Sequence, residues 1–159
     1  MSPLCQKHRK LEELAAMEPF YPLHVWVCDQ CFLVQLEEFV SPEEIFGDGE
    51  YAYFSSFSDS WLAHARTYVE GSAERFGLGE KSFVVEVASN DGYLLQYFKQ
   101  RDVRVLGIEP ASNTAEAARD KGIETLVRFF GKETADHVVE THGRADLIAG
   151  NNVLAHVPD

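Results

Sequence analysis

The sequence predicts an α/β protein with a parallel sheet in its C-terminal half and a small β-hairpin module near its N-terminus. From Ser82 onward, short apolar runs alternate with helical patterns, an order typical of right-handed crossovers in a parallel sheet. Before Val40, two β-branched and aromatic runs flank the turn Cys-Asp-Gln-Cys at 28–31, which predicts a strand, a tight turn and a second strand.

The expected elements follow from these patterns. The apolar run 83–87 suits a buried parallel strand, and further strands are expected at 104–108, 124–128 and 145–149. Helices are expected at 93–101, 114–121 and 133–141. Upstream, a helix capped by Ser58 or Asp59 should end at Gly77. One face of that helix is expected to carry Trp61, Ala65, Tyr68, Ser72 and Phe76.

Composition narrows the function classes. The chain has 159 residues, 25% of them charged and 45% hydrophobic, which indicates an ordinary globular protein with a core. A net charge of −12 argues against nucleic-acid partners and anionic membrane surfaces. No apolar stretch reaches the length of a membrane span, and the N-terminus lacks the pattern of a signal peptide. Three cysteines cannot close a disulfide framework, so we expect a cytoplasmic location.

The segment 86–92, Glu-Val-Ala-Ser-Asn-Asp-Gly, is the most informative motif. It follows the first buried strand, and ligands of open α/β sheets bind beyond the carboxyl ends of strands. In a dinucleotide-binding register, Tyr93 stands where the last glycine belongs. In a methyl-donor register, an acid is followed by small residues at every second place, as in Glu86, Ala88, Asn90 and Gly92. The spacing favours S-adenosylmethionine (SAM) over NAD, with a ligand-free strand-to-helix turn as the alternative.

A second acid supports the cofactor interpretation. Glu109 ends the second expected strand about 20 residues after the loop, where a carboxylate can accept both hydroxyls of a ribose. Pro110 then ends the strand. The alternative is a solvated acid at a strand end.

Four motifs together resemble a known family. They are the run 51–61 (Tyr-Ala-Tyr-Phe-Ser-Ser-Phe-Ser-Asp-Ser-Trp), the 86–92 loop followed by Leu94-Leu95, Gly-Ile-Glu-Pro at 107–110, and Asn-Asn-Val-Leu-Ala-His at 151–156. In this order they resemble the class I SAM-dependent C-methyltransferases of deoxysugar biosynthesis. The resemblance implies a zinc-binding N-terminal module, a Rossmann-like SAM domain and a C-terminal domain. It also implies methyl transfer to a carbon of a nucleotide-linked 4-keto deoxysugar.

The resemblance assigns roles to individual residues. Tyr53 and Ser56 are expected to reach the sugar, and His156 to contact it or assist proton transfer, against the alternatives of a packed aromatic linker and a surface histidine. The expected cofactor-binding residues are Glu86, Ala88, Ser89, Asn90, Asp91, Gly92, Glu109, Pro110, Asn151 and Asn152.

The N-terminal cysteines predict half of a metal site. The family carries two Cys-x-x-Cys knuckles, and Cys28 and Cys31 match one of them. Zinc takes four ligands in a closed site, so two thiolates supply half. Cys5 and His8 are nearby candidates, although Cys5 does not lie where the family's knuckle would. A redox dithiol is the other interpretation, and the strand-like sequence on both sides disfavours it.

The expected organisation is a partial zinc-binding-like module at 1–47, a linker and capping helix at 48–80, and a SAM-binding Rossmann-like domain at 81–159. The chain ends soon after His156, before the family's remaining strands and C-terminal domain. We therefore expect this chain alone to bind SAM without methylating. A non-catalytic SAM-binding module is the alternative function. We also expect the strand 145–149 to lie at an exposed edge, where a second copy could pair to form a homodimer.

Overall fold

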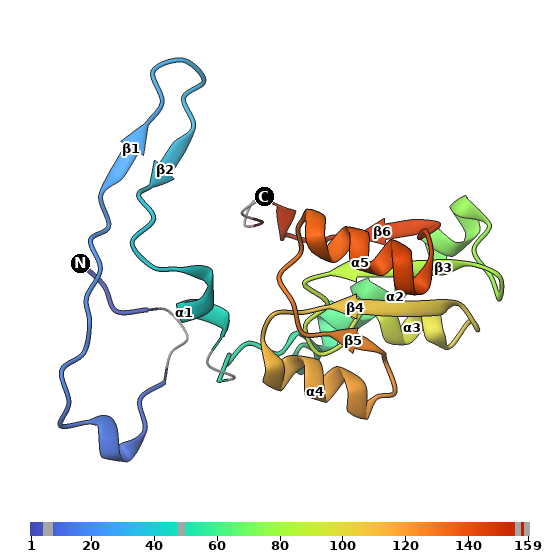
Figure 1. Ribbon diagram of the computed structural model, residues 1–159, viewed down its shortest axis with the longest axis horizontal. Coiled ribbons are helices and arrows are strands. Elements are labelled where there is room, and N and C mark those ends of the chain that lie inside the picture. The colour runs from blue at the N-terminus through green and yellow to red at the C-terminus, as the bar shows by residue number, and fades with distance from the viewer. Residues whose placement is uncertain (5–7, 48–49, 155–156, 158–159) are drawn as a thin grey trace. The chain divides into compact units, whose positions relative to one another are not determined.

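The computed structural model describes residues 1–4, 8–47, 50–154 and 157. The chain forms two compact units, Met1–Tyr53 and Phe54–Asp159 (Figure 1). Our three-part division at 47 and 80 remains a prediction.

The second unit is built on a four-stranded parallel sheet. Its strands are β3 (Phe83–Val87), β4 (Arg104–Ile108), β5 (Thr125–Leu126) and β6 (Leu147–Ala149), in the order β5-β4-β3-β6. The chain moves outward from β3 to β5 and then returns to the other side of β3. The strand order therefore reverses between β3 and β6, which is the switch point of a Rossmann-like fold. The predicted fold class is confirmed.

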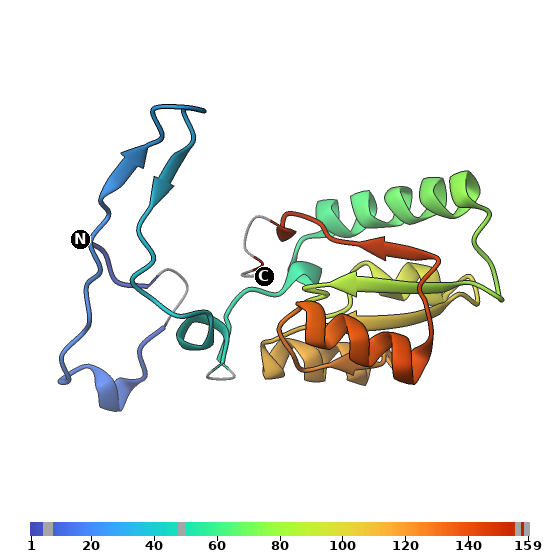
Figure 2. The same cartoon turned by 45° about the horizontal axis from the view of Figure 1, so that its top comes forward.

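Helices cover both faces of this sheet. They are α2 (Asp59–Phe76), α3 (Leu95–Lys99), α4 (Ser112–Asp120) and α5 (Lys132–His142). Figure 2 shows α2 and α5 on opposite sides of the sheet. Successive residues of β3 point to opposite faces, so Val84 packs in the core of α2 and α3 while Phe83 and Val85 pack with Val138 of α5. The core on the α2 side includes Leu94, Leu95 and Phe98.

Three expected elements are shorter than their sequence patterns, and one of them is the strand expected at 145–149, which spans only Leu147–Ala149. The helix expected at 93–101 spans Leu95–Lys99, because the chain first completes a turn with Gly92 in the left-handed region, and Asp102, also left-handed, follows the helix. The strand expected at 124–128 is only Thr125–Leu126, which pairs with Gly107 and Ile108.

The helix α2 begins and ends where its sequence predicts. The hydroxyl of Ser58 accepts from the backbone N–H of Trp61, and Gly77 ends the helix in the left-handed conformation. The face expected to carry Trp61, Ala65, Tyr68, Ser72 and Phe76 is, apart from Ala65, not the face that α2 buries. Phe76 is 54% exposed because the buried residues of α2 follow one another at intervals of four, and Phe76 lies only three positions after Ala73. Tyr68 is likewise exposed and Ser72 is only half-buried, and the helix instead buries Ala65, Val69 and Ala73.

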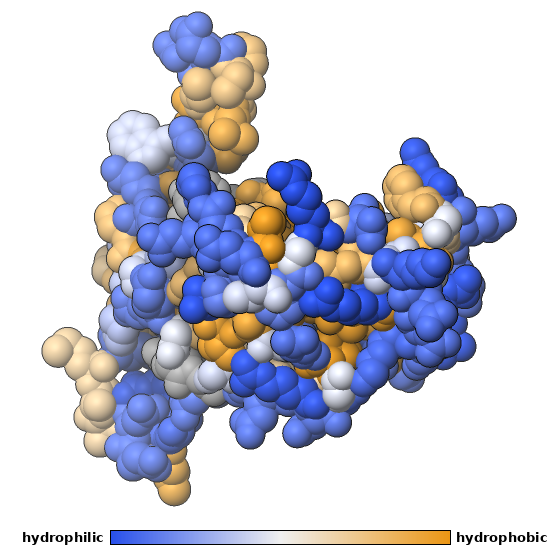
Figure 3. All heavy atoms as spheres, turned by 45° about the vertical axis from the view of Figure 1, so that its right-hand side comes forward, coloured by the Kyte–Doolittle hydropathy of each residue, from blue (hydrophilic) through white to orange (hydrophobic). Residues whose placement is uncertain are grey.

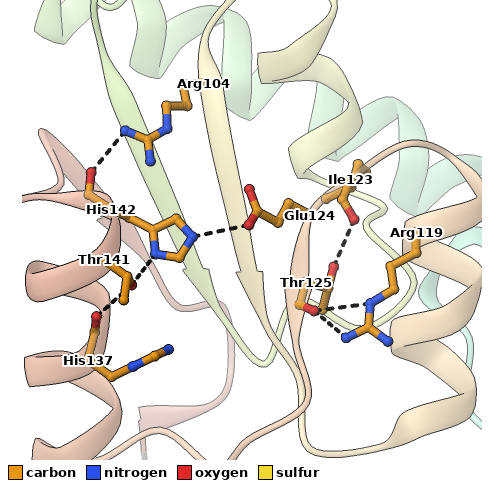
Figure 4. Close-up of polar contacts among 8 residues, drawn as sticks. All are labelled: Arg104, Arg119, Ile123, Glu124, Thr125, His137, Thr141 and His142. Atoms are coloured by element: carbon orange, nitrogen blue, oxygen red, sulfur yellow. Dashed lines mark hydrogen bonds and ion pairs between the residues drawn. The ribbon is translucent and has the colours of Figure 1, made fainter.

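Polar contacts tie the starts of β4 and β5 to the neighbouring helix ends (Figure 4). Arg104 donates to the carbonyl oxygen of His142 over 2.9 Å, and Nε2 of His142 lies 3.1 Å from a carboxylate oxygen of Glu124. Arg119 donates twice to the carbonyl oxygen of Thr125, over 3.1 and 2.5 Å. These contacts hold α4 and α5 in register with the sheet.

The first unit is a hairpin with short helical turns. It contains a 3₁₀ turn at Leu11–Glu13, the strands β1 (Val25–Val27) and β2 (Val34–Leu36), and the helix α1 (Pro42–Phe46). The strands pair antiparallel, with Trp26 opposite Gln35, which confirms the predicted strand-turn-strand. No described residue of this unit is buried, and Figure 3 shows apolar side chains at the surface of the hairpin. None of the described helices in either unit is long and apolar enough to span a bilayer.

Candidate functional site

The turn after β3 has an unusual backbone. Ala88 and Asn90 have φ angles of 52° and 50°, and Gly92 has 76°. A Cβ atom on Gly92 would lie 2.5 Å from Cδ1 of Ile123, so the turn is packed against the chain behind it. At positions 88, 90 and 92 the backbone therefore lies in the left-handed region, which residues with a Cβ atom adopt less often than glycine.

Three carboxylates are buried around this turn. Glu86, Asp91 and Glu109 are all less than 5% exposed. Burial raises the pKa of Glu86 well above its usual range, and the charges of Glu109 and Asp91 raise it further. Burial also raises the pKa of Glu109, against the lowering effect of its backbone hydrogen bonds. One oxygen of Glu86, one of Asp91 and the hydroxyl of Ser89 have no hydrogen-bond partner among the described residues.

Glu109 has a role that the sequence did not indicate. Its two carboxylate oxygens accept the backbone N–H of Asn90 over 2.8 Å and that of Ala111 over 2.9 Å. Glu109 therefore holds the turn after β3 against the chain that follows β4 and Pro110. Because each carboxylate oxygen has a second lone pair, the side chain is still able to accept ribose hydroxyls. That assignment stays a prediction.

The loop after β6 reaches the same region. The side-chain amide of Asn151 donates to the hydroxyl of Tyr93 over 3.4 Å, and Asn152 has a φ of 54°. The expected cofactor-binding residues thus all follow or end the strands β3, β4 and β6 at their carboxyl ends. This is the edge where ligands of open α/β sheets bind. The polar atoms without partners and the close-packed turn fit a cofactor with a charged end and a ribose.

A short 3₁₀ turn, η2 (Ser55–Phe57), is bound to the turn after β3. The backbone N–H of Ser55 donates to Oδ1 of Asn90 over 2.8 Å, and that of Ser56 donates to Oδ2 of Asp91 over 3.3 Å. Lys121 joins the two segments. Its Nζ donates to the hydroxyl of Ser56 and the carbonyl oxygen of Asp91, each over 2.8 Å, and lies 3.1 Å from Oδ2 of Asp91.

Sequence reasoning missed Lys121. Its partners lie 30 and 65 positions away, and a lysine just after a helix and before Gly122 is typical of an ordinary helix C-terminus. No local pattern in the sequence marks it as part of this site.

The expected substrate-binding residues are described only in part. Ser56 lies in η2, where its backbone N–H contacts Asp91 of the turn after β3. Tyr53 belongs to the first unit, where its side chain is 45% exposed. His156, the expected catalytic residue, lies outside the described residues. Trp61 stacks on Tyr93 with ring centroids 5.9 Å apart, so this tryptophan packs beside the turn.

Cys28 and Cys31 lie in the hairpin turn of the first unit. The backbone N–H groups of Cys31 and Gln30 lower the pKa of the Cys28 thiol, which favours the thiolate that a metal binds. Two thiolates suit zinc chemically but supply only half of its ligands. The described residues contain no cluster of three or more metal-ligating side chains. Cys5 lies outside the described residues, and His8 is exposed.

Comparisons with known proteins connect both units to methyltransferases. A family profile described as "Putative zinc binding domain" matches residues 1–46. The C-methyltransferase NovU of Streptomyces niveus is 38% identical over 148 residues, which cover 93% of this chain and 35% of that protein. The chain thus spans about a third of the length of the curated relative that it matches.

One solved structure also matches. It is described as the "Crystal structure of a putative s-adenosyl-l-methionine-dependent methyltransferase", from Methanococcus maripaludis. It is 15% identical, with a TM-score of 0.36, and the match covers 61% of this chain and 38% of the other. The 38% identity to NovU over nearly the whole chain confirms the resemblance given by the motifs: this chain is similar to a C-methyltransferase.

Proposed function

We propose that this chain carries the SAM site of a C-methyltransferase that acts on a nucleotide-linked 4-keto deoxysugar. The observation that supports it most is the turn 88–92, which places buried carboxylates and strained backbone at the carboxyl ends of β3 and β4 beside the switch point. The identity to a C-methyltransferase supports the reaction class. The sugar substrate is part of the proposal and rests on the motif resemblance.

In this proposal the acidic residues around the turn have separate roles. Glu109 fixes the turn through Asn90 and is left with lone pairs for the ribose. The carboxylates of Glu86 and Asp91 lie where a cationic group would offset their burial. When bound, SAM supplies an electrophilic methyl group.

Methylation beside a ketone further requires a base that removes an acidified C–H proton and a site that aligns carbon, methyl and sulfur. We assign the base to His156 and the sugar contacts to Tyr53 and Ser56. Cysteine usage supports a cytoplasmic location for this chemistry.

The placement of the ribose is tested by calorimetric titration of SAM into the wild-type chain, Glu109→Ala and a control. Loss of two charge-assisted hydrogen bonds, each typically worth about 1.5–3 kcal/mol, should lower affinity by at least about tenfold. Glu116→Ala is the matched control, because Glu116 is an exposed acid on the adjacent helix α4.

Circular dichroism must show that Glu109→Ala is folded, since the variant also frees two backbone donors. Unchanged affinity in a folded variant would contradict the ribose assignment. Binding of NAD in place of SAM would contradict the cofactor. Methyl transfer to a nucleotide 4-keto sugar by this chain would contradict the expectation that the chain alone binds SAM without methylating.

A further inference from the structure

Lys121 is the one described cation in contact with the buried carboxylates around the cofactor turn. The side chain of Asp91 is only 3% exposed, whereas that of Lys121 is 34% exposed. A buried carboxylate that loses its cation keeps the cost of its desolvation without the compensating attraction. The charge of Lys121 therefore stabilises the turn in the conformation described above.

The same ammonium group also holds η2. It donates to Ser56 Oγ and to two oxygens of Asp91, while the backbone N–H groups of Ser55 and Ser56 donate to the side chains of the turn. Five hydrogen bonds thus connect residues 55–56, 90–91 and 121, which lie far apart in the sequence. These contacts all lie within the second unit.

We infer that Lys121 is a positioning residue that ties the segment 55–57 to the cofactor turn, so that SAM binding at the turn and substrate binding at the segment are coupled. This inference rests on the proposed function for the identity of the two ligands. The tether itself rests only on the contacts of Lys121, Ser56 and Asp91. Two binding regions joined through one charged group should each lose affinity when that group is removed.

The tether is tested without any ligand by amide hydrogen exchange on the full chain. In Lys121→Met, the amides of Ser55 and Ser56 should exchange at least about tenfold faster than in the wild type, because the ammonium group no longer holds them close to their acceptors on Asn90 and Asp91. The amides of Val84 and Val85 in β3 should be unchanged, which a general loss of stability would not allow. Lys81→Met is the matched control, because Lys81 is exposed and outside the network.

The effect of the tether on the proposed cofactor site is tested by titrating SAM into the same variants. Lys121→Met should bind SAM about fivefold more weakly or worse, and Lys81→Met should bind like the wild type. Unchanged exchange at Ser55 and Ser56 in folded Lys121→Met, or unchanged SAM affinity, would overturn the inference. Absence of SAM binding by the wild type would contradict the proposed function alone, and the exchange experiment would still decide on the tether.

A second variant covers the case in which Lys121→Met fails to fold. Ser56→Ala removes an acceptor of Lys121 from a half-buried residue and leaves the ion pair with Asp91 in place. Faster exchange at Ser55 in that variant supports the tether, and an unchanged rate contradicts it.

Discussion

Replacing Gly92 by alanine should destabilise the second unit by about 2–5 kcal/mol. Two effects add. The left-handed backbone, at φ 76°, costs a residue with a Cβ about 1–2 kcal/mol. The new Cβ would also lie 2.5 Å from Cδ1 of Ile123 and 3.3 Å from Cβ of Ala118, and overpacking a filled core typically costs about 1–3 kcal/mol. Ile123 is 1% exposed, so its side chain has little room to move away.

Gly77 provides the matched control for this experiment. It has a φ of 63°, and a Cβ there would meet nothing within 4 Å. Gly77→Ala should therefore show the backbone effect alone, about 1–2 kcal/mol. Urea unfolding followed by circular dichroism gives both free energies of unfolding. Losses of stability in Gly92→Ala and Gly77→Ala that agree within about 0.5 kcal/mol would refute the overpacking argument, because a difference of that size is typical of substitutions that meet no packed neighbour.

Three further predictions concern pH, zinc and association. Burial raises the pKa of Glu86, so this carboxyl keeps its proton to a higher pH in the folded state than in the unfolded state. Its contribution to the free energy of unfolding should be fully present below the pKa of the unfolded state and fall as the pH rises toward the pKa of the folded state. Glu86→Gln should make that fall shallower in urea unfolding from pH 4 to 8, and parallel curves for the two proteins would contradict the assignment. Zinc should be held weakly or not at all by Cys28 and Cys31 alone; stoichiometric zinc by elemental analysis, lost in Cys28→Ser and also in Cys5→Ser, would show that Cys5 completes the site. Ile148 is 60% exposed on β6, which pairs only with β3 among the described residues, so this chain should self-associate through that edge. Ile148→Lys should weaken the association, and sedimentation of the wild type as a clean monomer would count against the prediction.

Buried strands were the most predictable part of the fold. The bounds of β3 and β4 match the sequence-based ranges, because a run of apolar residues between turn residues has few other ways to be buried. The face of α2 was predicted less well. Helical spacing alone does not distinguish a stripe through Tyr68 from one through Val69, and only the packing partner decides between them.

The position of the turn after β3 was predictable because its residues are local in sequence, whereas the contacts around it were not. Glu109 is predicted to accept ribose hydroxyls, and its oxygens also accept two backbone N–H groups that become neighbours only when β3 and β4 pair. The contacts of Lys121 form only because η2 and the turn lie side by side in the fold, and no spacing of residues along the sequence predicts that arrangement. Long-range polar contacts of this kind follow from the fold and are invisible to a reading along the chain.

The turn 88–92 costs more stability than a connection between β3 and α3 requires. Ala88 and Asn90 each occupy the left-handed region, which typically costs on the order of 1–3 kcal/mol at a non-glycine residue. Around them lie three buried carboxylates, and Lys121 is the one described cation that pairs with any of them. A simple connection would be more stable with glycines in the turn and apolar residues in place of the acids. Such strain typically persists where the conformation serves a ligand, and a cationic cofactor would offset the charge of the carboxylates. SAM should therefore raise the melting temperature of the wild-type chain, and should raise it less for Glu86→Gln, in which the side chain can no longer release its proton to balance the charge of the cofactor.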